Sequence, residues 1–165
     1  MWWVALCVIL IPEMTHNDLV KIGKKWLIKA RSCSVVLTET QAQSGEIIDC
    51  VGWRRQLSIL IECKTSRADF RRDLKKWYRN SGPGIGQKRY FLAPKGIIPV
   101  DEVPVGWGLL EVDNGVVRTI KKQDLLYLDE RVASAEVPLL VAALRRSQIR
   151  SSGRRKQHRK AYSRA

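Results

Sequence analysis

The chain of 165 residues lacks the paired cysteines and histidines that build a zinc site or a disulfide framework. Its four cysteines contain no CxxC pair, and His16 and His158 lie far apart with no partner pattern around them. Cys50 and Cys63 stand in apolar, strand-like segments, where a reduced cysteine serves as a small core residue. This usage favours a reducing compartment, so we expect a cytoplasmic protein.

Long apolar runs are also missing. The apolar stretch from Met1 to Ile11 is too short to cross a bilayer, and it lacks the basic leader and cleavage site of a signal peptide. Three interpretations stay open for the apolar leader 1–13: a membrane-touching anchor, a segment docked on the core, or residues translated from an upstream start codon. Because Met14-Thr15 directly precedes a good helix start, we favour the third and expect no membrane partner.

Acidic residues are scarce, with 16 Asp and Glu against 30 Lys and Arg and a formal net charge of +14. Such an excess favours a polyanionic partner, most commonly nucleic acid. Nine of the basic residues lie in 145–165, which contains no acid and few apolar residues, so we expect this tail to be disordered when alone. It is either a nucleic-acid arm, which we favour, or a solubilising extension. Its candidate DNA contacts are Arg154, Arg155 and Lys156.

One strongly apolar run, Leu57 to Lys64, ends in a carboxylate and an ammonium two residues apart. A run of this kind predicts a strand buried on both faces, where a charge costs several kcal/mol unless it is paired or bound to a metal. Because strand side chains alternate, Glu62 and Lys64 should share one face, with Cys63 on the other. The sequence therefore predicts an acid and a base side by side in the sheet.

The remaining pattern predicts an α/β domain with a mixed central sheet flanked by helices. Helices are expected at 15–30, 67–79 and 134–148, and strands at 34–39, 46–51, 57–64, 88–93, 108–113 and 116–120. A hairpin connection is expected at 52–56, and Asn114-Gly115 is the dipeptide best suited to a type I′ turn. Pro138 is tolerable only near the first turn of its helix. The main domain should span 14–128, followed by a C-terminal helix and basic tail at 129–165.

Asp49, on the preceding predicted strand, is the candidate second carboxylate beside Glu62. Adjacent antiparallel strands can bring Asp49 and Glu62 together if both lie on one face. Two hard carboxylates suit Mg²⁺, and the backbone carbonyl of Cys63 is a candidate third ligand. Lys64 beside such a metal could orient or deprotonate an attacking water. The alternative is an ion pair at the surface, where the strands emerge.

The chain resembles the PD-(D/E)XK nuclease superfamily in one motif and in its order of elements. The motif is Asp49, twelve intervening residues and then Glu62-Cys63-Lys64, and the expected order is helix-strand-strand-strand-helix-strand. The resemblance covers residues 15–93. Within it, the amino-acid sequences of 46–49 and 62–70 are similar to those of small bacterial and phage proteins of the MmcB-like DNA-repair type. It implies a restriction-endonuclease-like αβββαβ core, here with an added C-terminal hairpin and helix. It also implies Asp49 and Glu62 as ligands of Mg²⁺, which Mn²⁺ can replace, and Lys64 as the catalytic lysine.

The chain departs from that pattern at two places. Ile48 stands where the superfamily has its proline, and the first helix carries only Asp18 where many relatives have a glutamate. Glu39 is the better candidate for a third acidic ligand than Glu46, which a regular strand would turn to the face opposite Asp49.

The resulting expectation is a Mg²⁺-dependent nuclease acting on DNA in repair, recombination or phage and host DNA processing, in a bacterial or phage-infected cell. The alternatives are a nucleic-acid-binding protein that keeps the fold but cuts nothing, and a scaffold or regulatory subunit. RNA as a partner and a homodimer stay open. The second helix offers either a DNA-contacting or a merely solvated basic face, formed by Arg72, Lys75, Lys76 and Arg79.

Overall fold

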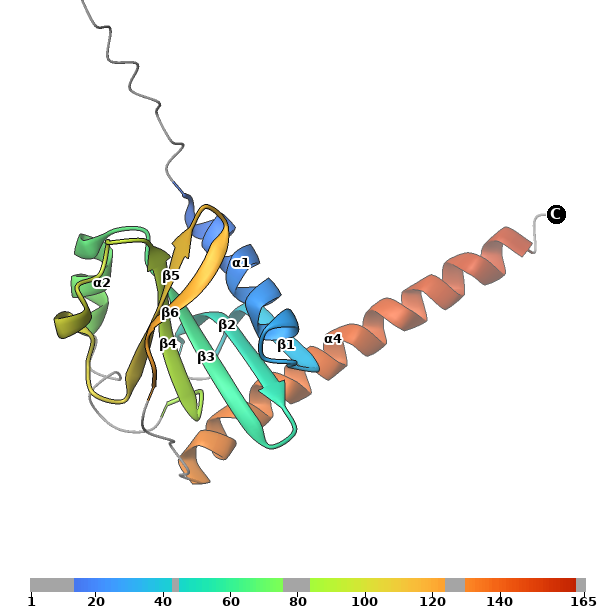
Figure 1. The fold of residues 1–165 in the computed structure, drawn as a ribbon. Coiled ribbons are helices and arrows are strands. Elements are labelled where there is room, and N and C mark those ends of the chain that lie inside the picture. The colour runs from blue at the N-terminus through green and yellow to red at the C-terminus, as the bar shows by residue number, and fades with distance from the viewer. Residues whose placement is uncertain (1–13, 43–44, 76–83, 124–129, 163–165) are drawn as a thin grey trace, which may run out of the picture.

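The computed structural model describes residues 14–42, 45–75, 84–123 and 130–162, with side chains described as far as residue 149. In chain order the elements are α1 (His16–Lys29), β1 (Val35–Gln41), β2 (Ile47–Arg54), β3 (Leu57–Cys63), α2 (Arg67–Leu74), β4 (Lys88–Pro94), η1 (Val100–Glu102), β5 (Trp107–Asp113), β6 (Val116–Lys121) and α4 (Glu130–Tyr162) (Figure 1). This order confirms the predicted αβββαβ core with an added hairpin and C-terminal helix. The apolar leader 1–13 lies outside the described residues.

The six strands form one mixed sheet, and they follow one another across it in chain order. β1, β2 and β3 are antiparallel neighbours, β3, β4 and β5 are parallel, and β6 returns antiparallel to β5. The carboxyl ends of β3, β4 and β5 therefore meet at the same edge of the sheet. Glu62 and Lys64 lie at that edge, where β3 ends.

Helices cover both faces of the sheet. On one face, α1 packs Leu19 and Leu27 against a cluster that includes Ile61 and Cys63. On the other face, Phe70 of α2 and Leu139 of α4 belong to a second cluster with Leu60, Phe91 and Trp107. The side chains of β3 thus alternate between the two faces as predicted, and the central strands β3 and β4 are buried on both sides.

Trp107 and Trp53 pack against the core through different contacts. Trp107 is buried and stacks on Phe91 with ring centroids 4.3 Å apart. Trp53 is half-buried, and its Nε1 donates a hydrogen bond to Glu136 Oε2 at 2.8 Å. Both side chains therefore contribute to packing inside the protein.

The helices α1 and α2 both begin at side-chain caps. The Thr15 hydroxyl accepts a hydrogen bond from the backbone N–H of Asp18, and the Asp18 carboxylate accepts one from the backbone N–H of Thr15, so α1 starts with a capping box. Ser66 Oγ accepts from the backbone N–H of Asp69, which starts α2 as predicted. These caps fix where each helix leaves the edge of the sheet.

The structure contains both predicted hairpins, but only one has the predicted turn. Asn114 and Gly115 both have positive φ, 50° and 78°, as a type I′ turn requires. The hairpin expected at 52–56 is present, but its connection is shorter than predicted, because β2 continues to Arg54, which pairs with Leu57. The turn is therefore only two residues long, and Arg55 adopts a φ of 54°.

The helix ends also differ from expectation. α2 ends at Leu74, with Lys75 as its C-cap, while the predicted continuation through Arg79 lies outside the described residues. α4 starts at Glu130 and contains Pro138 beyond its first turn, so the predicted start at 134 and the restriction on Pro138 are wrong. α4 also continues to Tyr162, so the predicted disorder of the tail is wrong up to that residue.

The tail is rich in Arg, Lys and Gln, which are good helix formers and extend α4 without a core. Figure 1 shows this end of α4 projecting away from the sheet. None of the helices in the described part of the chain is long and apolar enough to cross a membrane.

Candidate active site at the end of β3

Three buried charged side chains meet where β3 ends. Lys64 Nζ lies 3.5 Å from Glu62 Oε2 and 3.4 Å from Asp73 Oδ2. The exposed fractions of Glu62, Lys64 and Asp73 are 2%, 5% and 2%. The predicted acid and base are therefore side by side, and a second carboxylate, contributed by α2, joins them.

Local geometry explains why these groups converge. Glu62 points to the face covered by α2, because Ile61 and Cys63 point to the face covered by α1. On α2, Asp73 lies three residues after the fully buried Phe70, so both face inward. Sequence reasoning missed Asp73, although an acid next to the apolar stripe of Phe70 and Leu74 was the available signal.

Lys64 is the cation that compensates the two buried carboxylates. Burying an ion costs several kcal/mol unless a partner of opposite charge and hydrogen bonds compensate for the lost hydration. Lys64 supplies one positive charge to two carboxylates when all three are ionised. The group then carries net negative charge, which is complementary to a cation.

Asp49 lies on the neighbouring strand. The pairing of β2 with β3 ends at Cys50 and Ile61, and Asp49 and Glu62 are the next residues of the two strands beyond that pair. Its Oδ2 accepts a hydrogen bond of 2.7 Å from the backbone N–H of Cys63, and its Oδ1 lies 3.5 Å from His16 Nε2. His16, for which the sequence offered no partner, thus lies against a predicted metal ligand.

Glu39 stands opposite Asp49 on the other neighbouring strand. It falls between the pairs Thr38–Cys50 and Thr40–Ile48, and it adopts a φ of 46°. This left-handed conformation interrupts the regular pairing of β1 with β2, and the Glu39 side chain is exposed. The structure therefore places Glu39 across from Asp49 but not in the buried group around Lys64.

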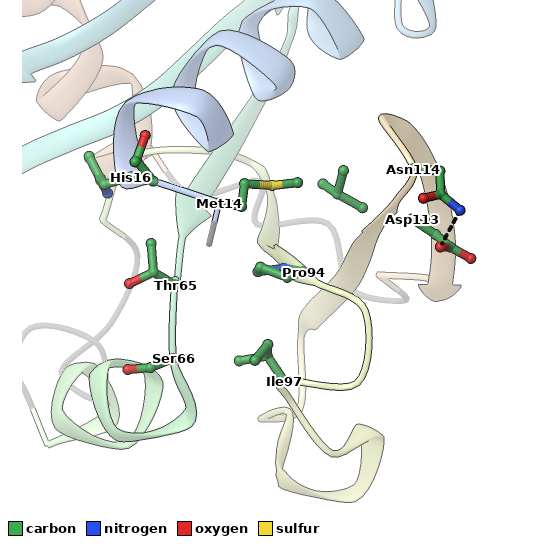
Figure 2. A pocket seen from close by; sticks show the side chains of 10 residues that line it. Met14, His16, Thr65, Ser66, Pro94, Ile97, Asp113 and Asn114 are labelled. Carbon is green, nitrogen blue, oxygen red and sulfur yellow. Dashed lines mark hydrogen bonds between the residues drawn. The ribbon is translucent and has the colours of Figure 1, made fainter. Parts of the chain in front are cut away.

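An open cleft of about 660 Å³ lies near this end of the sheet, and its lining does not include Asp49, Glu62, Lys64 or Asp73 (Figure 2). It lies at the carboxyl ends of β4 and β5 and at the starts of α1 and α2. Thr65 and Ser66 directly follow Lys64 on its wall, and His16 connects it to Asp49. The residues that line it are Met14, Thr15, His16, Thr65, Ser66, Pro94, Ile97, Val112, Asp113 and Asn114. Ligands commonly bind in such a crevice beyond the carboxyl ends of parallel strands.

The predicted DNA contacts on α2 are only partly described. Arg72 and Lys75 are exposed, whereas Lys76 and Arg79 lie outside the described residues. The structure places the backbone of Arg154, Arg155 and Lys156 in α4 and does not describe their side chains.

Two further arginines of α2, Arg67 and Arg71, are engaged within the protein. Both contact the Glu102 carboxylate, Arg71 Nη2 at 2.8 Å from its Oε1. Hydrogen bonds from Arg71 and then Arg67 lower the pKa of Glu102 to about 2. These two cations are therefore already paired with a carboxylate.

The described cysteines behave as core residues. Cys33, Cys50 and Cys63 are free and buried. A hydrogen bond with Cys50, followed by burial, raises the pKa of the Cys63 thiol well above its usual value, which keeps it protonated. The structural interpretation of Cys50 and Cys63 is confirmed.

The donor set of the site fits Mg²⁺ in kind. Within residues 14–149, excluding the undescribed stretches, no three His, Cys, Asp or Glu side chains converge to hold a metal by themselves. Mg²⁺ does not require such a cage, because it commonly binds one or two carboxylates and takes its other ligands from water and phosphate. Asp49 and Glu62 are two carboxylates on adjacent strands, Asp49 against His16 of α1 and Glu62 on the face covered by α2.

Comparison with known proteins supports the fold. No protein-family model and no curated protein matches the chain. Among solved structures, the chain is similar to a protein of unknown function from Silicibacter pomeroyi, with a TM-score of 0.61 and 23% identity, over 83% of this chain and 92% of that one. The class that this likeness and the topology define is an α/β fold with a mixed sheet flanked by helices.

Proposed function

We propose that the chain is a Mg²⁺-dependent deoxyribonuclease of the PD-(D/E)XK type, resembling the MmcB-like proteins, that acts in DNA repair, recombination or phage and host DNA processing in the cytoplasm. The observation that supports it best is the buried Lys64 ammonium, held between the Glu62 and Asp73 carboxylates at the end of β3. Apolar side chains could fill this space at no electrostatic cost, so a buried charge here points to chemistry.

Each residue has a separate role in this proposal. Asp49 and Glu62 would hold Mg²⁺, which when bound stabilises the negative charge that develops on the phosphate. Lys64 orients the attacking water by hydrogen bonding and supplies positive charge next to the phosphodiester. Asp73 positions the Lys64 ammonium, and the Cys63 backbone N–H fixes the Asp49 carboxylate.

A second candidate is a nucleic-acid-binding protein that keeps the fold but cuts nothing. It is favoured by the burial of Lys64, which is only 5% exposed and already contacts two carboxylates. In that case the charged group serves stability alone.

A cleavage panel separates the two candidates. Wild type, Lys64→Ala and Asp49→Ala are incubated with Mg²⁺ or Mn²⁺ and plasmid, linear, single-stranded and branched DNA, and RNA. Since a positioned proton-transfer group contributes roughly 10²- to 10⁴-fold, Lys64→Ala should lose at least about a hundredfold in cleavage rate. Asp49→Ala removes a proposed metal ligand and should also lower the rate with either metal. DNA binding in EDTA should stay close to that of wild type.

The matched control is Lys122→Ala, which removes an exposed lysine that follows β6. It should cleave like the wild type. Circular dichroism and thermal unfolding show whether each variant is folded, and Asp73→Asn tests the site without removing the lysine. Equal cleavage by wild type and folded Lys64→Ala would rule out the catalytic assignment.

A further inference from the structure

The outer face of α1 carries a row of exposed lysines. Lys21, Lys24, Lys25 and Lys29 are all exposed, and their spacing of three, four and eight residues places them on one side of the helix. With the half-exposed Ile28 they line a shallow hollow of about 260 Å³.

Acidic side chains do not neutralise this row. Asp18 is the acid of α1, and its carboxylate is engaged by the Thr15 hydroxyl at 2.6 Å and lies 4.0 Å from Lys21. Elsewhere in the described part of the chain, no carboxylate lies within ion-pair distance of Lys24, Lys25 or Lys29. Four like charges along about 12 Å of helix repel one another, so a polyanion would relieve the repulsion.

The row also leads to the candidate active site. α1 begins at the cleft with Thr15 and His16, and His16 contacts Asp49. The lysines follow one to four turns further along the helix. At 3.4 Å per nucleotide, a face of about 12 Å spans roughly three to four phosphates of one strand.

We propose that the basic face of α1, formed by Lys21, Lys24, Lys25 and Lys29, binds the phosphate backbone of duplex DNA and directs one strand toward the cleft. The proposal rests on the proposed function only in choosing DNA as the polyanion. An anionic membrane is the other partner for a basic helix, but such a helix inserts its apolar face. The apolar residues Leu19 and Leu27 of α1 are fully buried against the sheet and not available for insertion.

The test variant is Lys24→Gln with Lys25→Gln, which keeps helix propensity because glutamine and lysine are similar helix formers. Its control is Arg118→Gln with Lys122→Gln, which removes the same charge from β6 and its end, at the opposite edge of the sheet from β1. Binding of each to a short fluorescent DNA duplex is measured in EDTA over a range of salt concentrations.

The α1 variant should bind on the order of tenfold more weakly, with a salt slope shallower by up to about 1.8, or about 0.9 for each phosphate that the variant no longer neutralises. The control should change much less. Equal effects in the two variants would mean that net charge alone matters, and an unchanged slope would overturn the proposal as well.

Vesicles of equal parts phosphatidylserine and phosphatidylcholine form the second arm. Loss of vesicle binding with DNA binding retained would assign the face to a membrane and overturn the proposal. Because binding is measured without a divalent cation, a catalytically inert protein can still satisfy this test, so its outcome is separate from that of the cleavage panel.

Discussion

Lys64 is surrounded by two buried carboxylates, so its removal leaves like charges facing each other. We expect Lys64→Met to lower the free energy of unfolding by about 3–5 kcal/mol, the usual cost of breaking a buried ion pair from one side. Asp73→Asn should cost much less, since Lys64 and Glu62 remain as a balanced pair. Urea unfolding measures both.

The control for this comparison is Lys95→Met. Lys95 lies 2.8 Å from Asp113, but its side chain is 65% exposed, and surface pairs are worth about 0–1 kcal/mol. A loss for Lys64→Met as small as that for Lys95→Met would contradict the picture of a buried charged group.

Glu102 offers a pH-dependent test at the scale of a single residue. Its pKa falls from 4.5 to about 2 in the folded protein because Arg71 and Arg67 donate hydrogen bonds to it. A lowered pKa stabilises the fold above pH 4.5, and this contribution is lost as the pH falls from about 4.5 to 2. Wild type should therefore exceed Glu102→Gln in stability at pH 7.

The difference between wild type and Glu102→Gln should shrink steadily below pH 4.5 in thermal unfolding. Asp101→Asn, at the exposed neighbouring position, is the control for the loss of one negative charge from the same turn. A difference that stays constant down to pH 2 would show that the contacts of α2 with Glu102 do not hold in solution.

At the scale of elements, one carboxylate attaches α4 to the sheet. The Glu136 side chain accepts hydrogen bonds from Trp53 Nε1 at 2.8 Å and from the backbone N–H of Gly86 at 2.9 Å, and it is 7% exposed. We expect Glu136→Ala to cost about 2–5 kcal/mol, because hydrogen bonds to a charged group contribute about 1.5–3 kcal/mol and the two donors lose their partner. Chemical denaturation measures the loss.

The matched control is Glu130→Ala, at an exposed position in the first turn of the same helix. Glu136→Ala should also speed the cleavage of α4 by trypsin under native conditions, whereas Glu130→Ala should not. Equal rates for the two variants would mean that apolar packing around Leu139 holds α4 without Glu136.

At the scale of the whole molecule, the C-terminal part of α4 concentrates positive charge away from the sheet (Figure 1). Deleting 151–165 removes six Lys and Arg. We expect weaker DNA binding across all sequences, with a salt slope that flattens by about 0.9 for each phosphate that the tail had neutralised. Fluorescence anisotropy on unrelated duplexes measures both.

A full-length control separates charge from helix length. Replacing Arg154, Arg155 and Lys156 with glutamine removes half of that charge and keeps good helix formers. It should give an intermediate salt slope. A deletion that leaves the slope unchanged would assign the tail to solubility and not to nucleic acid.

Sequence patterns predicted the elements well where local rules decide them. Thr15 and Ser66 start their helices, and Asn114-Gly115 makes the turn, because capping and positive φ depend on a few neighbouring residues. The extents of β2 and α4 were missed. Strand pairing carries β2 to Arg54, and helix-forming residues carry α4 far beyond the apolar pattern.

The candidate site, too, was predictable only where its residues belong to one element. Alternation along β3 was enough to predict that Glu62 and Lys64 share a face, since the two residues belong to one strand. Asp73 beside Lys64 and His16 beside Asp49 come from helices packed on opposite faces of the sheet. No local pattern specifies such contacts, because they depend on how each helix is placed against the strands. The sequence by itself determined the charged end of β3, and the tertiary structure alone decided which side chains surround it.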